Sequence, residues 1–163
     1  MVVCVLLSII LTSKGIQNFY KNVKIALEPK REIEKLRYIM VIHKLHDATV
    51  FNRKLGDLEL DPVLIGGFLN SIQTFSSEIK DKGTFMRKME YKDFEILFEQ
   101  GEYILSALFI DGEESDWLRE KLKLFSQEFE RNFEDKLKDW KSEVSAFKKS
   151  DALIERIFEL YRL

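Results

Sequence analysis

Residues 60–82 read LDPVLIGGFLNSIQTFSSEIKDK, and the prediction of the fold starts from this stretch. Asp61 is a favourable helix N-cap, and Pro62 suits the first helical position, where the missing N–H has no intrahelical partner to lose. Large apolar residues then recur in steps of four, three and four at Phe68, Ile72, Phe75 and Ile79. Leu64, four residues before Phe68, extends this series upstream. This spacing predicts an amphipathic helix of about six turns whose apolar stripe is buried.

Two adjacent glycines lie near the start of this helix. Gly66 and Gly67 each cost roughly 1 kcal/mol of helix propensity relative to alanine, so we expect the helix backbone to approach another element closely. We interpret that element as a β-sheet. A phosphate-binding loop is not indicated, because the glycines lie inside a helix and no Gly-Lys-Ser/Thr ending follows them.

Composition indicates a single well-packed domain. The chain has 163 residues, of which 45% are hydrophobic and 33% charged, with thirteen phenylalanines against two prolines. A net charge of −2 gives no reason to expect nucleic-acid binding. Cys4 is the single cysteine, which excludes an intrachain disulfide and fits a reducing compartment. Its apolar surroundings predict a small buried side chain.

The first 35 residues differ in character and are predicted to form an N-terminal arm. Residues 2–11, VVCVLLSIIL, are too few to cross a bilayer as a helix and lack the preceding basic residue of a signal peptide. We favour a buried strand or a partner-dependent apolar arm over a signal. Residues 16–27 have the pattern of a basic amphipathic helix ended by Pro29, and the run 30–35, KREIEK, is either a membrane- or partner-binding arm or a solvated helix face.

The remaining residues, 36–163, read as one domain of alternating strands and helices. Residues 38–42 and 49–55 predict a hairpin that precedes the first long helix, and residues 84–91, 94–98 and 103–110 predict three strands after it. The most apolar strands, 38–42 and 103–110, are expected at the centre of the sheet. The segment 84–91 carries charges that suit an edge strand.

The last third of the chain predicts two helices. The first begins near Ser115 or Asp116 and has a continuous apolar stripe: Leu118, Leu122, Phe125, Phe129, Phe133, Leu137 and Trp140. The second is expected to be capped by Asp151 and to bury Ile154, Ile157, Phe158 and Tyr161. The order predicts an α/β (α+β) domain in which a five-stranded, largely antiparallel sheet has one helix on one face and two on the other.

This order and the motif of the first helix resemble longin-like domains, relatives of the roadblock and profilin-like folds, and specifically archaeal proteins associated with small GTPases. The resemblance covers residues 36–163. It rests on a set of positions in the first helix, preceded by Val50-Phe51: Asp61-Pro62, Leu64-Ile65, Gly67-Phe68-Leu69, Ile72 and Phe75. Phe129-Glu130, Trp140 and Phe147 agree more loosely, and the arm of about 35 residues departs from the family pattern.

The resemblance implies a non-catalytic interaction platform. Such domains form homodimers or heterodimers with other longin or roadblock domains, bind small GTPases and take part in vesicle trafficking. We therefore expect a cytoplasmic scaffold without cofactors, able to contact a membrane peripherally through residues 1–27. The expected partner surfaces are the outward face of residues 61–82 and the edge at 84–91, with Phe85, Arg87 and Met89 as candidate contacts.

Catalytic and metal-binding patterns are weak in this chain. His43 and His46, with Asp47 as a third ligand, offer a metal hypothesis, but polar turn chemistry is the simpler interpretation. Glu113, Glu114 and Asp116 are explained by a helix N-terminus better than by a pair of catalytic carboxylates. The sequence shows no Ser-His-Asp or Cys-His arrangement, so we expect no enzyme. The alternative function is a small-molecule sensor with a pocket between helix and sheet.

Overall fold

The computed structural model of the protein describes residues 16–17, 29–79 and 85–162. The predictions for Cys4, for the apolar run 2–11 and for most of the helix 16–27 lie outside the described residues. Residues 16–17 are helical, as the pattern predicted.

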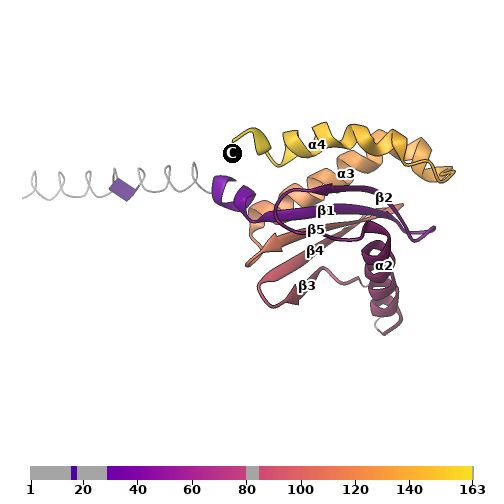
Figure 1. Ribbon diagram of the computed structural model, residues 1–163, viewed down its shortest axis with the longest axis horizontal. Helices are drawn as coiled ribbons and strands as arrows, with labels where there is room; N and C mark the ends of the chain where they lie inside the picture. The colour runs from indigo at the N-terminus through magenta and orange to yellow at the C-terminus, as the bar shows by residue number, and fades with distance from the viewer. Residues whose placement is uncertain (1–15, 18–28, 80–84, 163) are drawn as a thin grey trace, which may run out of the picture.

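One antiparallel sheet of five strands forms the centre of the domain (Figure 1). The strands are β1 (Leu36–His43), β2 (Ala48–Lys54), β3 (Lys88–Tyr91), β4 (Phe94–Gln100) and β5 (Ile104–Asp111). Their spatial order is β2-β1-β5-β4-β3, and every neighbouring pair is antiparallel. The apolar strands β1 and β5 therefore lie inside the sheet and the charged β3 lies at an edge, which confirms both predictions.

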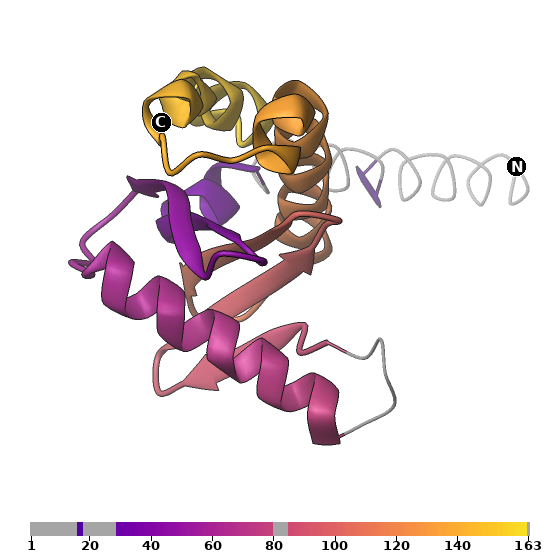
Figure 2. The same cartoon turned by 90° about the vertical axis from the view of Figure 1, so that its right-hand side faces the viewer.

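Helices cover both faces of this sheet. Helix α2 (Pro62–Ile79) lies on one face, and α3 (Asp116–Lys138) and α4 (Ser150–Ile157) lie on the other (Figures 1 and 2). A 3-10 helix, η1 (Ser145–Lys149), leads directly into α4, and a second, η2 (Leu160–Arg162), follows it. The predicted fold class, one helix on one face and two on the other, is confirmed.

The larger hydrophobic core lies between the sheet and the pair α3 and α4. Phe125, Phe129, Phe147 and Phe158 are completely buried there, with ring centroids of successive neighbours 5.6 to 6.3 Å apart. Ser115 caps α3, because its hydroxyl accepts the N–H of Leu118 at 3.2 Å. Most of the apolar stripe predicted for this helix is buried as expected, from Leu118 to Leu137. Trp140 does not belong to it, because α3 ends at Lys138 and the Trp140 ring stacks on His43.

The end of the N-terminal arm packs onto this core. Residues 29–34 are helical, and Ile33 is 3% exposed within the core cluster. The Glu32 carboxylate accepts hydrogen bonds from the Ser115 hydroxyl at 2.7 Å and from the Lys35 ammonium at 3.0 Å. The run 30–35 is therefore partly buried, which neither sequence interpretation of it foresaw.

Two details predicted for the last helix are wrong. Asp151 does not cap α4, because η1 continues into the helix without an extended residue between them, and Asp151 lies in the first turn. Tyr161 lies beyond the helix and is 73% exposed, because α4 ends at Ile157 and Glu159 has a positive φ of 56°.

Candidate interaction surface

Helix α2 directs its largest apolar side chains away from the sheet. Phe68, Phe75 and Leu64 are 53%, 64% and 69% exposed. The prediction that this stripe is buried is therefore wrong for these three residues; Ile72 is half-buried, and the side chain of Ile79 lies outside the described part of the structure. The buried side of the helix consists of Gly66, Leu69, Asn70 and Gln73 instead.

A close approach between α2 and β2 explains this orientation. The Thr49 hydroxyl donates a hydrogen bond to the carbonyl of Pro62 at 2.7 Å, and a Cβ on Gly66 would collide with that hydroxyl. No aromatic side chain fits between backbones at this separation, so only small or slender residues can face the strand. The predicted close approach is confirmed for Gly66 and wrong for Gly67, whose added Cβ would meet nothing within 4 Å.

The outward side of α2 forms an uncharged apolar surface, which we call the α2 face. It consists of residues within about one third of the helix circumference: Leu64, Gly67, Phe68, Ser71 and Phe75. The N-cap Asp61, whose carboxylate accepts the N–H of Val63 at 3.0 Å, is followed by no charged residue until Glu78. Exposed apolar surface without charges is typical of the centre of protein interfaces.

A glutamine side chain connects α2 to the neighbouring sheet edge. Nε2 of Gln73 donates to the carbonyl of Met86 at 2.8 Å, and the Met86 N–H donates to Oε1 of Gln73 at 2.9 Å. Met86 lies two residues before β3, so these bonds hold the C-terminal half of α2 beside the β3 edge of the sheet (Figure 2).

The β3 edge is short and carries alternating charges. The Lys88 ammonium lies 2.7 Å from the carboxylate of Glu90 and 3.1 Å from that of Glu95, and these hydrogen bonds raise the pKa of Lys88. On the other face of the strand, the Tyr91 side chain is 55% exposed, with its ring 5.2 Å from that of Phe94. Charges at an edge restrict pairing to partners that complement them.

The predicted contact residues around β3 differ in accessibility. Arg87 is exposed, and its carbonyl accepts the N–H of Phe98 at 2.9 Å. Met89 is half-buried against the core on the α2 side, and Phe85 is half-buried at the wall of a small cavity. Their role in binding stays a prediction. The apolar spacing predicted Leu64, Phe68 and Phe75 in the core. Residues 62–77 carry no charge, so no charged side marked the opposite face of the helix as the one in water.

The histidine pair forms an aromatic cluster. Nε2 of His43 donates to the carbonyl of Leu137 at 2.9 Å, and the ring stacks on Trp140 at 5.4 Å. The His46 ring lies 4.8 Å from that of His43, and the carboxylate of Asp47 accepts the amide of Asn70. Among the described residues, no group of three or more His, Cys, Asp or Glu side chains could hold a metal ion.

The acidic residues before α3 take part in structural contacts. The Glu114 carboxylate pairs with Arg119 at 2.6 Å, and the backbone N–H of Glu114 donates to the Glu95 carboxylate at 2.8 Å. Asp116 lies in the first turn of α3, where a negative charge favours the helix dipole. These contacts agree with the structural interpretation of the cluster.

No family model and no curated protein matches the chain. Among solved structures, it is similar to one described as "MglB with tetrameric arrangement", with 16% sequence identity and a TM-score of 0.35 over 56% of this chain and 71% of that chain. Within the described residues, no helix is both long and apolar enough to span a membrane. The strand order and helix placement themselves match the fold that the longin-like resemblance implies.

Proposed function

We propose that this chain is a non-catalytic interaction platform that dimerises through the α2 face and regulates or scaffolds a small GTPase. The observation that carries the dimer is the exposure of Leu64, Phe68 and Phe75 on a helix surface without charge. Burying apolar surface of this kind contributes roughly 25 cal/mol per Å² removed from water.

A second copy of the chain is the occupant that best fits the α2 face. Two such faces meet without opposing like charges, because residues 62–77 carry none. Gly67 and Ser71 lie between the large side chains and leave space for a partner's aromatic rings. A surface with both projections and recesses can pair with itself about a two-fold axis.

The helix face alone is small for a stable interface. At 1.5 Å per residue, α2 is about 27 Å long, and a standard interface buries about 800 Å² on each partner. The adjacent β3 edge, with Glu90 and the exposed Tyr91, can supply the remaining contact, because an edge strand can pair with a strand of the partner.

The small-GTPase part of the proposal is supported by the resemblance to longin-like domains and by the fold. The dimer would present a composite surface to the GTPase or to a membrane-traffic complex in the cytoplasm. Residues 1–27 would allow peripheral contact with a membrane, because an apolar run is followed there by basic residues.

Light scattering coupled to chromatography tests the dimer. We expect the full-length chain to elute as a dimer at micromolar concentration and the double variant Phe68→Glu/Phe75→Glu to elute as a folded monomer. Leu124→Glu is the matched control, because Leu124 is 44% exposed on α3 and should leave the dimer intact. A wild-type monomer, or a control variant that dissociates equally, would contradict the proposal.

Binding to small GTPases of the source organism tests the second part. Each GTPase is titrated with the full-length chain in its GDP-bound and GTP-analogue-bound forms by calorimetry. Binding at low micromolar concentration or tighter supports the proposal. No affinity at tens of micromolar for either form would refute the GTPase role and leave the dimer unaffected.

A further inference from the structure

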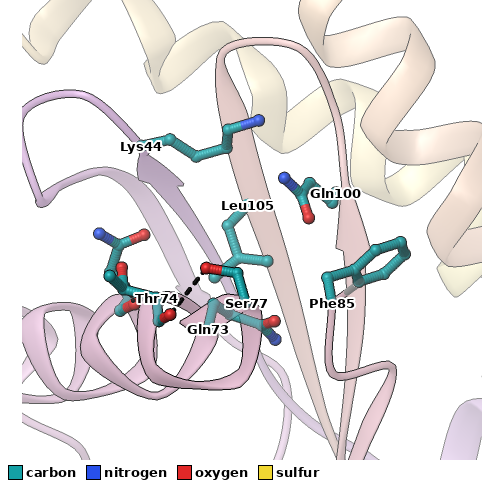
Figure 3. Close-up of a pocket in the computed structure, with 8 residues that line it drawn as sticks. Lys44, Gln73, Thr74, Ser77, Phe85, Gln100 and Leu105 are labelled. Carbon is teal, nitrogen blue, oxygen red and sulfur yellow. Dashed lines mark hydrogen bonds between the residues drawn. The ribbon is translucent and has the colours of Figure 1, made fainter. Parts of the chain in front are cut away.

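A cavity of about 240 Å³ opens between α2 and the sheet (Figure 3). It lies where β1 ends, at Lys44, and where β4 passes into β5, at Gln100 and Leu105. Thr74 and Ser77 line it from α2, and Phe85 closes one side. The volume is below the roughly 300 to 1,000 Å³ of pockets for drug-sized molecules, so the cavity fits a small ligand.

Most polar groups of the cavity wall have internal partners. Both polar atoms of the Gln73 side chain bind the backbone of Met86, and the hydroxyls of Thr74 and Ser77 donate to carbonyls of their own helix at 3.1 and 2.7 Å. These hydroxyls have donated their protons, so they offer only lone pairs to a ligand. They would therefore not favour an anion at the α2 side.

Lys44 differs from these residues because its ammonium still has hydrogen-bond donors available for a ligand. Its ammonium donates to the carbonyl of Gly101 at 2.7 Å, which leaves two N–H groups. Among the described residues, no carboxylate lies within 4.0 Å of this ammonium, and the cavity wall contains no acidic side chain. The Gln100 side chain extends toward the same end of the cavity (Figure 3), and no hydrogen bond of its amide occurs within the described residues.

Burial leaves the charge of Lys44 incompletely compensated. Desolvation lowers the pKa of Lys44, and the more distant carboxylates of Glu130 and Glu102 oppose this effect. The Glu130 carboxylate is itself engaged by the N–H groups of residues 102–104. The carboxylate of Asp47 accepts the amide of Asn70, which lines the cavity, so this acidic group is also engaged. An anionic ligand in contact with Lys44 would stabilise its charged form.

We propose that this cavity binds a small monocarboxylate, with its carboxylate between the Lys44 ammonium and the Gln100 amide and its alkyl part against Leu105 and Phe85. The single cation balances one negative charge, and the neutral amide can donate a hydrogen bond to the second carboxylate oxygen. A phosphate dianion would need more donors than the wall offers, since Thr74 and Ser77 present lone pairs. The proposal is independent of the dimer and of GTPase binding.

Nuclear magnetic resonance of the full-length, ¹⁵N-labelled chain tests this site. Propionate, inorganic phosphate and chloride are titrated separately at constant ionic strength. We expect propionate to cause saturable shifts in the backbone amides of residues 44, 73–77 and 100–101, with millimolar affinity as suits so small a ligand. Phosphate should bind at least tenfold more weakly, and chloride should cause no saturable change.

Two variants and a control make the test specific. Lys44→Met removes the cation, and Ser77→Leu fills the cavity from α2; each should weaken propionate binding at least tenfold. Lys123→Met, an exposed lysine on α3, should bind as the wild type does. Binding should also weaken as rising pH removes the proton of Lys44.

Three outcomes overturn the proposal. Propionate that causes no saturable shift at the cavity excludes the site. Equal binding by the wild type and by both Lys44→Met and Ser77→Leu places the ligand elsewhere. Phosphate that binds as tightly as propionate refutes the assignment to monocarboxylates.

Discussion

Helices α2 and α3 cover opposite faces of one sheet and use similar apolar periodicity in opposite ways. On α3, Leu122, Phe125 and Phe129 are completely buried, and the exposed side is charged. On α2, Phe68 and Phe75 are more than half exposed, and the buried side contains Gly66 and Gln73. The spacing of apolar residues thus identifies a helix face without telling which way it points.

The residues opposite the stripe carry the missing information. An apolar stripe opposed by lysines and glutamates must face the core, because ions keep their side of the helix in water. The opposite side of α2 has glycine, amide and small residues, which tolerate burial when they pack closely or find hydrogen-bond partners. Orientation therefore follows from where the charges are, and α2 has none over residues 62–77.

Replacing one phenylalanine on each helix by alanine should give the largest difference in the free energy of unfolding. Phe129→Ala should lower the free energy of unfolding by about 3 to 5 kcal/mol, because the ring is fully buried against Phe125 and Phe147. Phe68→Ala should change it by less than about 0.5 kcal/mol in the monomer. Urea unfolding followed by circular dichroism, at concentrations too low for dimers, measures both. An equal loss for the two variants would show that the α2 face is not outward.

Much of the sheet could be predicted from the sequence, because strand position depends on local composition. The apolar runs around Ile39 and Leu108 indicated central strands, and the charges around Lys88 indicated an edge. The α2 orientation could not be predicted from periodicity, because it depends on the contact of Gly66 with Thr49, which are far apart in the chain. The residues that line the cavity could not be predicted for the same reason, because Lys44, Thr74 and Gln100 lie far apart in the chain.

Polar side chains also tie both helices to the strands and their loops, and on α3 one of them is Glu130. Its carboxylate accepts the N–H groups of Glu102, Tyr103 and Ile104 at 3.1, 2.7 and 3.1 Å. Glu130→Ala leaves these donors without the carboxylate, so the free energy of unfolding should fall by about 2 kcal/mol. Glu120→Ala, on the exposed side of the same helix, is the control and should be neutral. Equal urea midpoints for the two variants would contradict this role.

Gln73 plays the corresponding part on α2, with a smaller expected effect. Gln73→Ala removes two neutral hydrogen bonds to Met86, which should cost about 1 to 2 kcal/mol. The loss should appear locally, as faster hydrogen exchange at the Met86 amide, while amides of β5 keep their protection. Gln127→Ala, at an exposed position of α3, serves as the control. Unchanged exchange at Met86 would show that the glutamine does not hold α2 to the β3 edge.

The smallest expected effect on stability is the pH dependence that Lys44 contributes, at the junction between α2 and the sheet. Burial lowers the pKa of Lys44 in the folded chain, whereas the unfolded chain has the ordinary value of about 10.4. Between these two values the unfolded chain binds more protons, so the free energy of unfolding contributed by Lys44 rises with pH. The difference in stability between the wild type and Lys44→Met should therefore move in favour of the wild type as the pH climbs from neutral to about 10.4. Urea unfolding of both proteins across this range, in buffer without carboxylates, measures the difference, and other titrating groups cancel in the subtraction. If the free energies of unfolding of the two proteins instead change in parallel with pH, the Lys44 ammonium is as well solvated in the fold as in the unfolded chain. The cavity would then lack the uncompensated charge that attracts an anion.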